Sequence, residues 1–410
     1  MPAVSLEKAQ RIMRRIDTLA QYSAMDGMVT RAYLTAQHKA AHQQLAEWMQ
    51  QAGLQTWQDE VGNQWGRLVS ANPTQGTLII GSHSDTVVNA GKYDGPLGVI
   101  MAIEALASLQ GQALPFHVDV VAFADEEGTR FNTTLLGSSG VCGCWNPAWL
   151  DIVDADGISI GQALAEFGLE AAAIGQASRQ AESLKGYLEV HIEQGPMLES
   201  LDLAVGVVTG IAGAKRYLID IKGVAGHAGT VPLALRHDAL CAAAEMISCT
   251  ESFAQQQQIV ATVGKCQIRG GAVNVIPGNV QFSLDIRSQD QAQLELCCQQ
   301  LLEQYRTIAA ARAVTINIEN IYQASAVPCD AKLQAQWGEA VAAVTGKPAY
   351  YLSSGAGHDA MMMANITPMG MLFLRCEKGI SHNPRENVQL DDVAVALACL
   401  IQMLHSASAW

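Results

Sequence analysis

Imidazole and carboxylate side chains gather at the ends of four short apolar segments of the sequence. These segments are residues 77–83, 116–124, 187–193 and 371–375. The polar residues within them or soon after them are His83, Asp85, Asp94, Glu126, Glu127, His191, Glu193 and His382. A set of His, Asp and Glu side chains without cysteine suits Zn²⁺ or Mn²⁺, and a carboxylate can bridge two such ions about 3.5–4 Å apart. The pattern therefore favours a metal site.

Each of these residues also has a simpler interpretation. A lone histidine at a strand end is more often a hydrogen-bonded polar residue than a ligand, and two adjacent acids usually form a solvated turn. Glu126 and Glu127, however, directly follow a strongly apolar segment, where two charges need cations or strong hydrogen bonds. Because all four segment ends carry such groups, the metal interpretation is preferred.

The four apolar segments alternate with helical patterns, such as residues 98–109. Short apolar strands that alternate with helices predict an α/β fold, in which helices cover both faces of a mostly parallel central sheet. Open parallel sheets bind ligands beyond the carboxyl ends of their strands. The polar residues that follow the four segments are therefore expected to meet at one edge of the sheet.

The pattern changes between residues 211 and 326. Strands and helices are predicted there in the order β-α-β-β-α-β, which is typical of a ferredoxin-like α+β unit. The predicted strands are 215–223, 258–268, 279–287 and 314–322, and the predicted helices are 238–254 and 291–311. We therefore predict a discontinuous domain of residues 1–210 and 327–410, interrupted by a smaller domain at 211–326.

The composition excludes several classes of protein. The chain has 410 residues, of which 49% are apolar and 16% charged, so it can form a folded core. Its formal net charge of −14 argues against nucleic acids and anionic membranes as partners, because Lys and Arg patches bind phosphate groups. We find no signal-peptide pattern and no stretch near the roughly 18 apolar residues of a membrane span. Ten cysteines without a C-x-x-C pair fit buried thiols, so a cytoplasmic location is expected.

Six motifs, taken together, resemble a known family. They are G-S-H-S-D-T-V, G-K-Y-D-G-P-L-G, D-E-E-G-T-R-F, H-I-E-Q-G-P-x-L-E, G-H-A-G-T-x-P and S-H-N-P-R-E. From about residue 25 to residue 400 the chain resembles the di-metal aminoacylase and carboxypeptidase-like superfamily. Within it, the motifs are similar to the ureido-cleaving branch, which contains allantoate amidohydrolase, N-carbamoyl-L-amino-acid hydrolase and β-ureidopropionase.

The resemblance implies that each subunit binds two divalent ions, either Zn²⁺ or Mn²⁺. The implied ligands are His83, Asp94, Glu127, His191 and His382, with Asp94 bridging the two ions. Glu126 is similar to the family's general base, which takes a proton from a water that a divalent ion has acidified. Asp85 is expected to orient the imidazole of His83, with a role as a loop or helix cap as its alternative.

The remaining implied residues contact the substrate. His227 is the candidate partner of the oxyanion that develops on the substrate carbonyl, although its simpler interpretation is an exposed loop histidine. In related enzymes this histidine reaches the active site of the other subunit, so a homodimer through the inserted domain is expected. A planar guanidinium matches a carboxylate, so Arg287 is expected to bind a substrate carboxylate together with Asn274. The other implied contacts are Gln194, Arg216, Gly355 and Gly357.

The resemblance implies hydrolysis of a C–N bond in a linear ureido acid, with release of ammonia and CO₂. Allantoate is the first choice of substrate, an N-carbamoyl-L-amino acid is the second, and the substrate of β-ureidopropionase is a further alternative. The segment Gly213-Ala214-Lys215-Arg216 has Ala214 where the family commonly has Gln, which leaves the preferred ureido compound open. A non-catalytic binding protein of the same fold is the rival from another class. It would lack a ligand or the base, whereas this chain has the expected residue type at each position.

Overall fold

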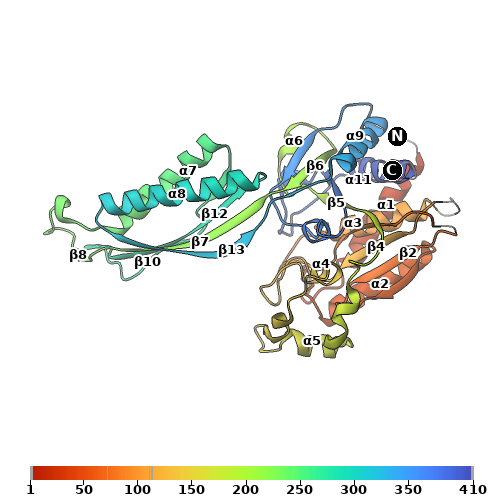
Figure 1. Ribbon diagram of the computed structural model, residues 1–410, viewed down its shortest axis with the longest axis horizontal. Helices are drawn as coiled ribbons and strands as arrows, with labels where there is room; N and C mark the ends of the chain where they lie inside the picture. Colours follow the sequence, from red (N-terminus) through yellow and green to blue (C-terminus); the bar gives the residue numbers. More distant parts are fainter. Residues whose placement is uncertain (1–2, 72, 110, 112–113, 408–410) are drawn as a thin grey trace. The chain divides into compact units, whose positions relative to one another are not determined.

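Two compact units make up the chain, which the computed structural model describes at residues 3–71, 73–109, 111 and 114–407. The inserted unit spans Gly210–Pro328, and the main unit contains the described residues before and after it (Figure 1). Among the described helices, none is long and apolar enough to cross a bilayer.

A mixed, mostly parallel sheet forms the centre of the main unit. Its strands follow the order β1-β2-β4-β3-β5-β16-β6, and β15 also pairs with β6. The bounds are Gln55–Gln58 (β1), Gln64–Leu68 (β2), Thr77–His83 (β3), Val118–Phe123 (β4), Leu184–Ile192 (β5), Val205–Ile211 (β6), Tyr351–Ser354 (β15) and Met369–Leu374 (β16). Strand β3 is parallel to β4 and β5, and β5 is parallel to β16. The four predicted segments are therefore neighbouring parallel strands whose carboxyl ends share one edge of the sheet.

Five of the described helices pack on the face of this sheet that forms the main hydrophobic core, and the short helix α10 also contacts β5 and β16. Alternate side chains of a strand point to opposite faces of a sheet. In β5, Leu188, Val190 and Ile192 belong to the main hydrophobic core, which also contains side chains of α1, α2, α3, α9 and α11. Glu189 and His191 alternate with them and face the other side. The helices of the main unit are Ala3–Leu19 (α1), Ala36–Gln51 (α2), Pro96–Ala107 (α3), Leu136–Val141 (α4), Ile160–Phe167 (α5), Met197–Ser200 (α6), Ala331–Thr345 (α9), Ala360–Met363 (α10) and Leu390–Ser406 (α11). The predicted α/β architecture is confirmed.

The inserted unit has the predicted ferredoxin-like order of elements. Its sheet has the order β10-β12-β7-β13, and β9 also pairs with β12. Helices α7 and α8 pack against each other and against β12, on one face of this sheet (Figure 1). The bounds are Gly213–Lys222 (β7), Gly226–His227 (β8), Ala239–Gln257 (α7), Val260–Thr262 (β9), Cys266–Ile268 (β10), Val275–Ile276 (β11), Asn279–Ser288 (β12), Gln291–Ala311 (α8), Thr315–Ala324 (β13) and Val327–Pro328 (β14).

The predicted strand 258–268 differs from the structure in one respect, because it is broken into β9 and β10. Thr262 of β9 lies opposite Asp285, and Cys266 of β10 lies opposite Phe282. The three residues between Thr262 and Cys266 thus face only two residues of β12. One extra residue interrupts the ladder of hydrogen bonds, as a β-bulge does.

The carboxylate of Asp119, buried in β4, is shared by two arginines. It accepts hydrogen bonds from Arg67 Nε and Nη2, each at 2.7 Å, and pairs with Arg179 Nη1 at 2.7 Å. Asp119→Ala leaves these guanidinium groups without their shared anion, so we expect the free energy of unfolding to fall by about 3–5 kcal/mol. Urea denaturation followed by circular dichroism measures this loss. Glu303→Ala, in an exposed pair with Arg306, is the control and should cost less than about 1 kcal/mol. An equally small loss for Asp119→Ala would contradict the prediction.

Candidate active site

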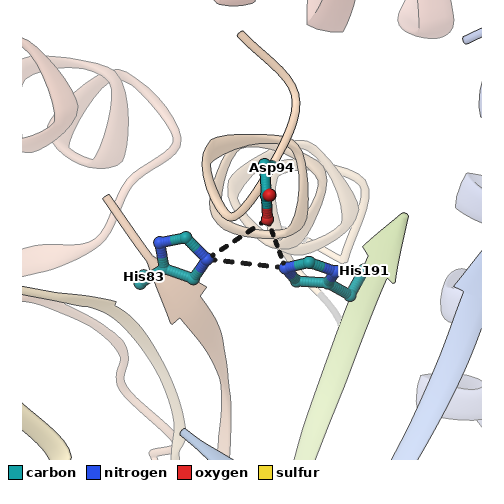
Figure 2. A group of neighbouring side chains, drawn as sticks. All are labelled: His83, Asp94 and His191. Carbon is teal, nitrogen blue, oxygen red and sulfur yellow. Dashed lines mark hydrogen bonds and ion pairs between the residues drawn. The ribbon is translucent and has the colours of Figure 1, made fainter. Parts of the chain in front are cut away.

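Three buried side chains meet beyond the carboxyl ends of β3 and β5. His83 is the last residue of β3, His191 lies near the end of β5, and Asp94 lies in the loop before α3. His83 Nε2 and His191 Nε2 are 3.5 and 3.1 Å from the same oxygen, Asp94 Oδ1, and 3.5 Å from each other. Figure 2 shows the three groups pointing toward one another. We call them the inner group.

Main-chain carbonyls hold the outer nitrogens of both imidazoles. His83 Nδ1 is 3.1 Å from the carbonyl oxygen of Asp85, and His191 Nδ1 is 2.9 Å from that of Ile192. A proton on each Nδ1 satisfies these contacts and leaves each Nε2 facing Asp94. Asp94 Oδ1 is buried and accepts no hydrogen bond within the described part of the chain. Two imidazole nitrogens and an unpartnered carboxylate oxygen therefore converge, and this donor set fits a divalent cation.

The other oxygen of Asp94 belongs to a second set of ligand-type atoms, which we call the outer group. His382 Nε2 is 3.2 Å from Asp94 Oδ2 and 3.3 Å from Glu127 Oε1. His382 lies in the loop after β16, and 49% of its side chain is exposed. Within each group the ligand-type atoms lie within 4.8 Å of one another. Asp94 is therefore shared by two groups, each of which can hold an ion.

Opposite charges compensate one another in this cluster when it holds no metal. Burial alone would raise the pKa of Asp94, but the facing imidazoles of His191, His382 and His83 hold it well below its usual value. Burial lowers the pKa of His83, yet the neighbouring carboxylates of Asp85 and Asp94 bring it well above its usual value. Hydrogen bonds to Asp94 and Glu127 raise the pKa of His382 to about 10. Protonated imidazoles thus supply the positive charge that a cation would otherwise bring.

Glu126 lies beside these groups. One of its oxygens is within 4.8 Å of ligand-type atoms of His83 and Glu127. Burial raises the pKa of its carboxyl well above the usual value, while His83 opposes this shift and Glu127 adds to it. A Cβ on Gly357 would lie 3.7 Å from Glu126 Oε1, so the glycine leaves space beside this oxygen. A carboxyl group with a raised pKa next to a cation site is suited to take up and return a proton.

The carboxylate of Asp85 holds the turn that carries Glu126 and Glu127. Its Oδ1 accepts a hydrogen bond from the main-chain N–H of Glu126 at 3.0 Å, and its Oδ2 accepts one from Glu127 at 3.2 Å. Asp85 Oδ1 is also 3.4 Å from His83 Nδ1. Asp85 therefore contacts the imidazole of His83, as expected. It also anchors Glu126 and Glu127, which the sequence pattern did not indicate.

Gly95 lies directly against the imidazole of His83. A Cβ at this position would be 2.5 Å from ring atoms of His83, and the backbone φ of +80° favours glycine. Because Gly95 follows Asp94 in the chain, the missing side chain lets this loop bring Asp94 close to His83.

Asp94 is also held by residues of two other loops. Its Oδ2 accepts hydrogen bonds from Gln194 Nε2 at 2.8 Å and from the Ser381 hydroxyl at 2.6 Å. Glu386 Oε1 accepts the main-chain N–H groups of Tyr93 and Asp94 at 2.7 and 3.1 Å. The sequence analysis singled out Gln194 but neither Ser381 nor Glu386. Both lie in the motif S-H-N-P-R-E, which was the signal that could have identified them.

Two of the predicted substrate contacts are neighbours near the paired strands β8 and β11 of the inserted unit. His227 is exposed, and its Nδ1 accepts a hydrogen bond from the N–H of Gly229 at 3.1 Å. The main-chain oxygen of Asn274 accepts the N–H of Ala228 at 2.9 Å. The structure therefore brings His227 and Asn274 together.

Arg216 and Arg287, also in the inserted unit, both bind Asp285. Arg216 Nε is 2.8 Å from Asp285 Oδ2, and Arg287 Nε is 2.8 Å from Asp285 Oδ1. These contacts with Asp285 raise the pKa of Arg287. Ala214 lies opposite Arg287 in the pairing of β7 with β12. Ala214, which stands where the family commonly has Gln, is thus the direct neighbour of Arg287, the residue that was expected to bind the substrate carboxylate.

The segment after β15 contributes a buried histidine and two glycines. The ring centroid of His358 is 4.6 Å from that of His191, and its Nε2 is 2.8 Å from Ser354 Oγ. Burial holds the pKa of His358 well below its usual value, so it packs against His191 as a neutral imidazole. A Cβ on Gly355 would meet no atom within 4 Å, whereas Gly357 lies beside Glu126.

At one edge of a mostly parallel sheet, two histidine and carboxylate groups that share one aspartate form a candidate metal centre. The chain belongs to peptidase family M20/M25/M40, whose profile matches residues 79–406. It is 38% identical to allantoate deiminase 2 of Glycine max, over 96% of this chain and 88% of that protein. It is 37% identical to the N-carbamoyl-L-amino acid amidohydrolase of Geobacillus stearothermophilus, over 96% and 97% of the two chains.

A solved structure of similar fold also belongs to an amidase. The hydantoinase/carbamoylase family amidase of Burkholderia multivorans has a TM-score of 0.92 and 31% sequence identity, over 98% of each chain. The expected resemblance to ureido-cleaving hydrolases is confirmed.

Proposed function

We propose that this chain is a two-metal amidohydrolase that cleaves a C–N bond of a linear ureido carboxylate, with allantoate as its substrate. The observation that carries the proposal is the sharing of Asp94, whose two oxygens face the inner group and the outer group separately. The similarity to an allantoate deiminase over nearly the whole chain supports this choice of substrate. The products would include ammonia and CO₂.

The proposed ligands are the five residues of the two groups. They are His83, Asp94 and His191 for one ion, and Asp94, Glu127 and His382 for the other. Histidine and carboxylate ligands without thiolates suit Zn²⁺ or Mn²⁺. When bound, such ions polarise the scissile carbonyl group and lower the pKa of water.

The chain's own residues would then move the proton and hold the geometry. Glu126 takes a proton from the attacking water and returns it to the leaving nitrogen. Asp85 keeps Glu126 in place through its hydrogen bond to the Glu126 N–H. Gln194 is close enough to Asp94 to contact a ureido group bound there. Gly357 leaves space beside Glu126 for that group.

The inserted unit would supply the contacts to the rest of the substrate. We propose that Arg287 and Asn274 bind its carboxylate, with Arg216 as a further contact, whereas Gly355, in the main unit, would line the ureido side of the substrate. His227 would stabilise the developing oxyanion, in the active site of a partner subunit, within a homodimer formed through the inserted unit. Its exposure supports this role, because an exposed imidazole can reach the surface of a second subunit. Sedimentation of the protein tests the homodimer, and a fully active monomer would contradict it.

An N-carbamoyl-L-amino acid is the second candidate substrate. The similarity to the Geobacillus stearothermophilus enzyme is nearly as high as that to the plant enzyme, and it covers almost all of both chains. Ala214, opposite Arg287, removes an amide that could distinguish between ureido compounds. A non-catalytic homologue is less favoured, because the two groups and Glu126 are complete.

Ammonia release from metal-reconstituted protein tests the proposed function. Allantoate, N-carbamoyl-L-amino acids and N-carbamoyl-β-alanine are compared side by side at equal concentration. We expect allantoate to give the highest kcat/KM. A higher value for a carbamoyl amino acid would replace the proposed substrate and leave the chemistry intact. No ammonia from any of the three, with two ions bound, would contradict the proposed function.

Metal binding is expected to release protons and to strengthen as the pH rises. In the metal-free chain the pKa of His382 is about 10, so this imidazole is protonated at neutral pH. An ion binds the neutral imidazole, so the apparent affinity should rise about tenfold per pH unit for each proton released, below pH 10. Calorimetric titration in two buffers of different ionisation enthalpy counts the protons. Binding without proton release, at constant affinity from pH 6.5 to 8, would contradict the displacement of a proton from His382 by the ion.

A further inference from the structure

One side chain joins the two loops that carry Asp94 and His382, which lie far apart in the sequence. Glu386 follows His382 in the loop after β16, and its Oε1 accepts the main-chain N–H groups of Tyr93 and Asp94 at 2.7 and 3.1 Å. The main chain at Asp94 is therefore fixed by an acid on the loop of His382.

A hydroxyl group makes a second connection between the same loops. Ser381 Oγ is 2.6 Å from Asp94 Oδ2 and 3.2 Å from Glu386 Oε2. Ser381 directly precedes His382, so a shift of this loop moves both the histidine and the hydroxyl that holds Asp94. The side chain and the main chain of Asp94 are thus both tied to the segment that carries His382.

Glu386 is enclosed by the loop that it holds. Only 4% of it is exposed, and a Cβ on Gly91 would lie 2.2 Å from its carboxyl carbon. In the described part of the chain, two main-chain N–H groups donate to its Oε1, and the Ser381 hydroxyl lies 3.2 Å from its Oε2. Burial of a carboxylate among neutral donors costs free energy that an apolar side chain would not cost. Stability alone therefore does not account for an acid at this position.

We propose that Glu386 is a positioning residue, which together with Ser381 sets the distance between Asp94 and His382 and so the affinity of the outer group for its ion. This inference rests on the proposed two-metal function. The two histidines of the inner group lie on adjacent buried strands, which hold them without Glu386. His382 is half exposed and lies on a loop. Loss of the connection should therefore weaken the outer group far more than the inner one.

Calorimetric titration of metal-free protein with Zn²⁺ tests the proposal. We expect wild type to bind two ions per chain. Glu386→Ala should keep the first binding step within about threefold and weaken the second by about 10–100-fold. Glu386→Gln should restore the second step to within about threefold, because its amide oxygen still accepts both N–H groups. Asp392→Asn is the control, since this buried acid of α11 pairs with Arg375 outside the site and should change neither step.

Three results would overturn the positioning role while leaving the two-metal centre intact. They are wild-type affinity for both ions in Glu386→Ala, equal weakening of both steps in that variant, and failure of Glu386→Gln to restore the second step. If circular dichroism shows that Glu386→Ala is unfolded, the same Zn²⁺ titration of Ser381→Ala tests the positioning role instead. A weaker second step in Ser381→Ala then supports the proposal, and wild-type affinity overturns it. Binding of fewer than two ions by wild type would instead contradict the proposed function itself.

Discussion

Glu126→Gln should reduce kcat for ammonia release by a factor on the order of 10²–10⁴, with two ions still bound. The amide keeps the size of the side chain but cannot accept a proton from water. Glu126 lies within 4.8 Å of ligand-type atoms of His83 and Glu127, which places a base next to the proposed ions. Its main-chain hydrogen bond to Asp85 does not depend on the side chain and is retained. Steady-state kinetics together with metal analysis measures both quantities on the same sample.

The adjacent Glu127→Gln is the matched control for this variant. It makes the same chemical change one residue along, but at a carboxylate that faces His382 in the outer group. We expect Glu127→Gln to lose the outer ion, whereas Glu126→Gln keeps both. Turnover of Glu126→Gln within about threefold of wild type would exclude Glu126 as the base. Loss of metal from the Glu126→Gln variant would indicate that Glu126 is a metal ligand and not the base.

Asp94→Asn should leave less than about one ion bound per chain and should bring ammonia release to background. One oxygen of Asp94 is 3.1 Å from His191 and the other is 3.2 Å from His382, so both groups lose a ligand in this variant. An amide also removes the negative charge that both divalent ions need. Metal analysis after gel filtration, followed by the ammonia assay, measures the effect.

A comparison of Asp94→Asn with His382→Ala tests whether both ions depend on Asp94. His382 belongs to the outer group alone, so this variant should keep the inner ion and lose the outer one. Two ions retained in Asp94→Asn, or equal losses in the two variants, would mean that Asp94 does not bridge. In that case the inner and outer groups would have to be treated as independent sites.

The sequence was sufficient to predict that residues such as His83, His191 and Glu127 would meet. Each follows or ends an apolar strand, and parallel strands place their carboxyl ends at one edge. Asp94 and His382 lie on loops; the strand-end pattern placed them at the same edge, and their assignment as ligands came from the motifs of the ureido-cleaving family. The structure shows why a loop suffices for Asp94, because Gly95 lets it approach the His83 imidazole.

Other features of the fold and the site were not predicted from the sequence. Strands β2 and β6 run antiparallel to β4 and β16, and neither of them was among the four segments predicted from the sequence. The break between β9 and β10 depends on one extra residue opposite β12, which alternation of apolar residues does not show. Glu386 and Asp85 act by accepting main-chain N–H groups of distant loops. Such contacts depend on the folded path of the chain and not on residue spacing.

Stepwise reconstitution of the metal-free protein tests the central claim most directly. Mn²⁺ is added in fractions of one equivalent, and ammonia release from allantoate, an N-carbamoyl-L-amino acid and N-carbamoyl-β-alanine is measured at each step. We predict no turnover without metal, and activity on at least one of these ureido acids that reaches its plateau at two ions per chain. Full activity in the metal-free protein, or no ammonia from any of the three at two ions per chain, would contradict a two-metal ureido hydrolase.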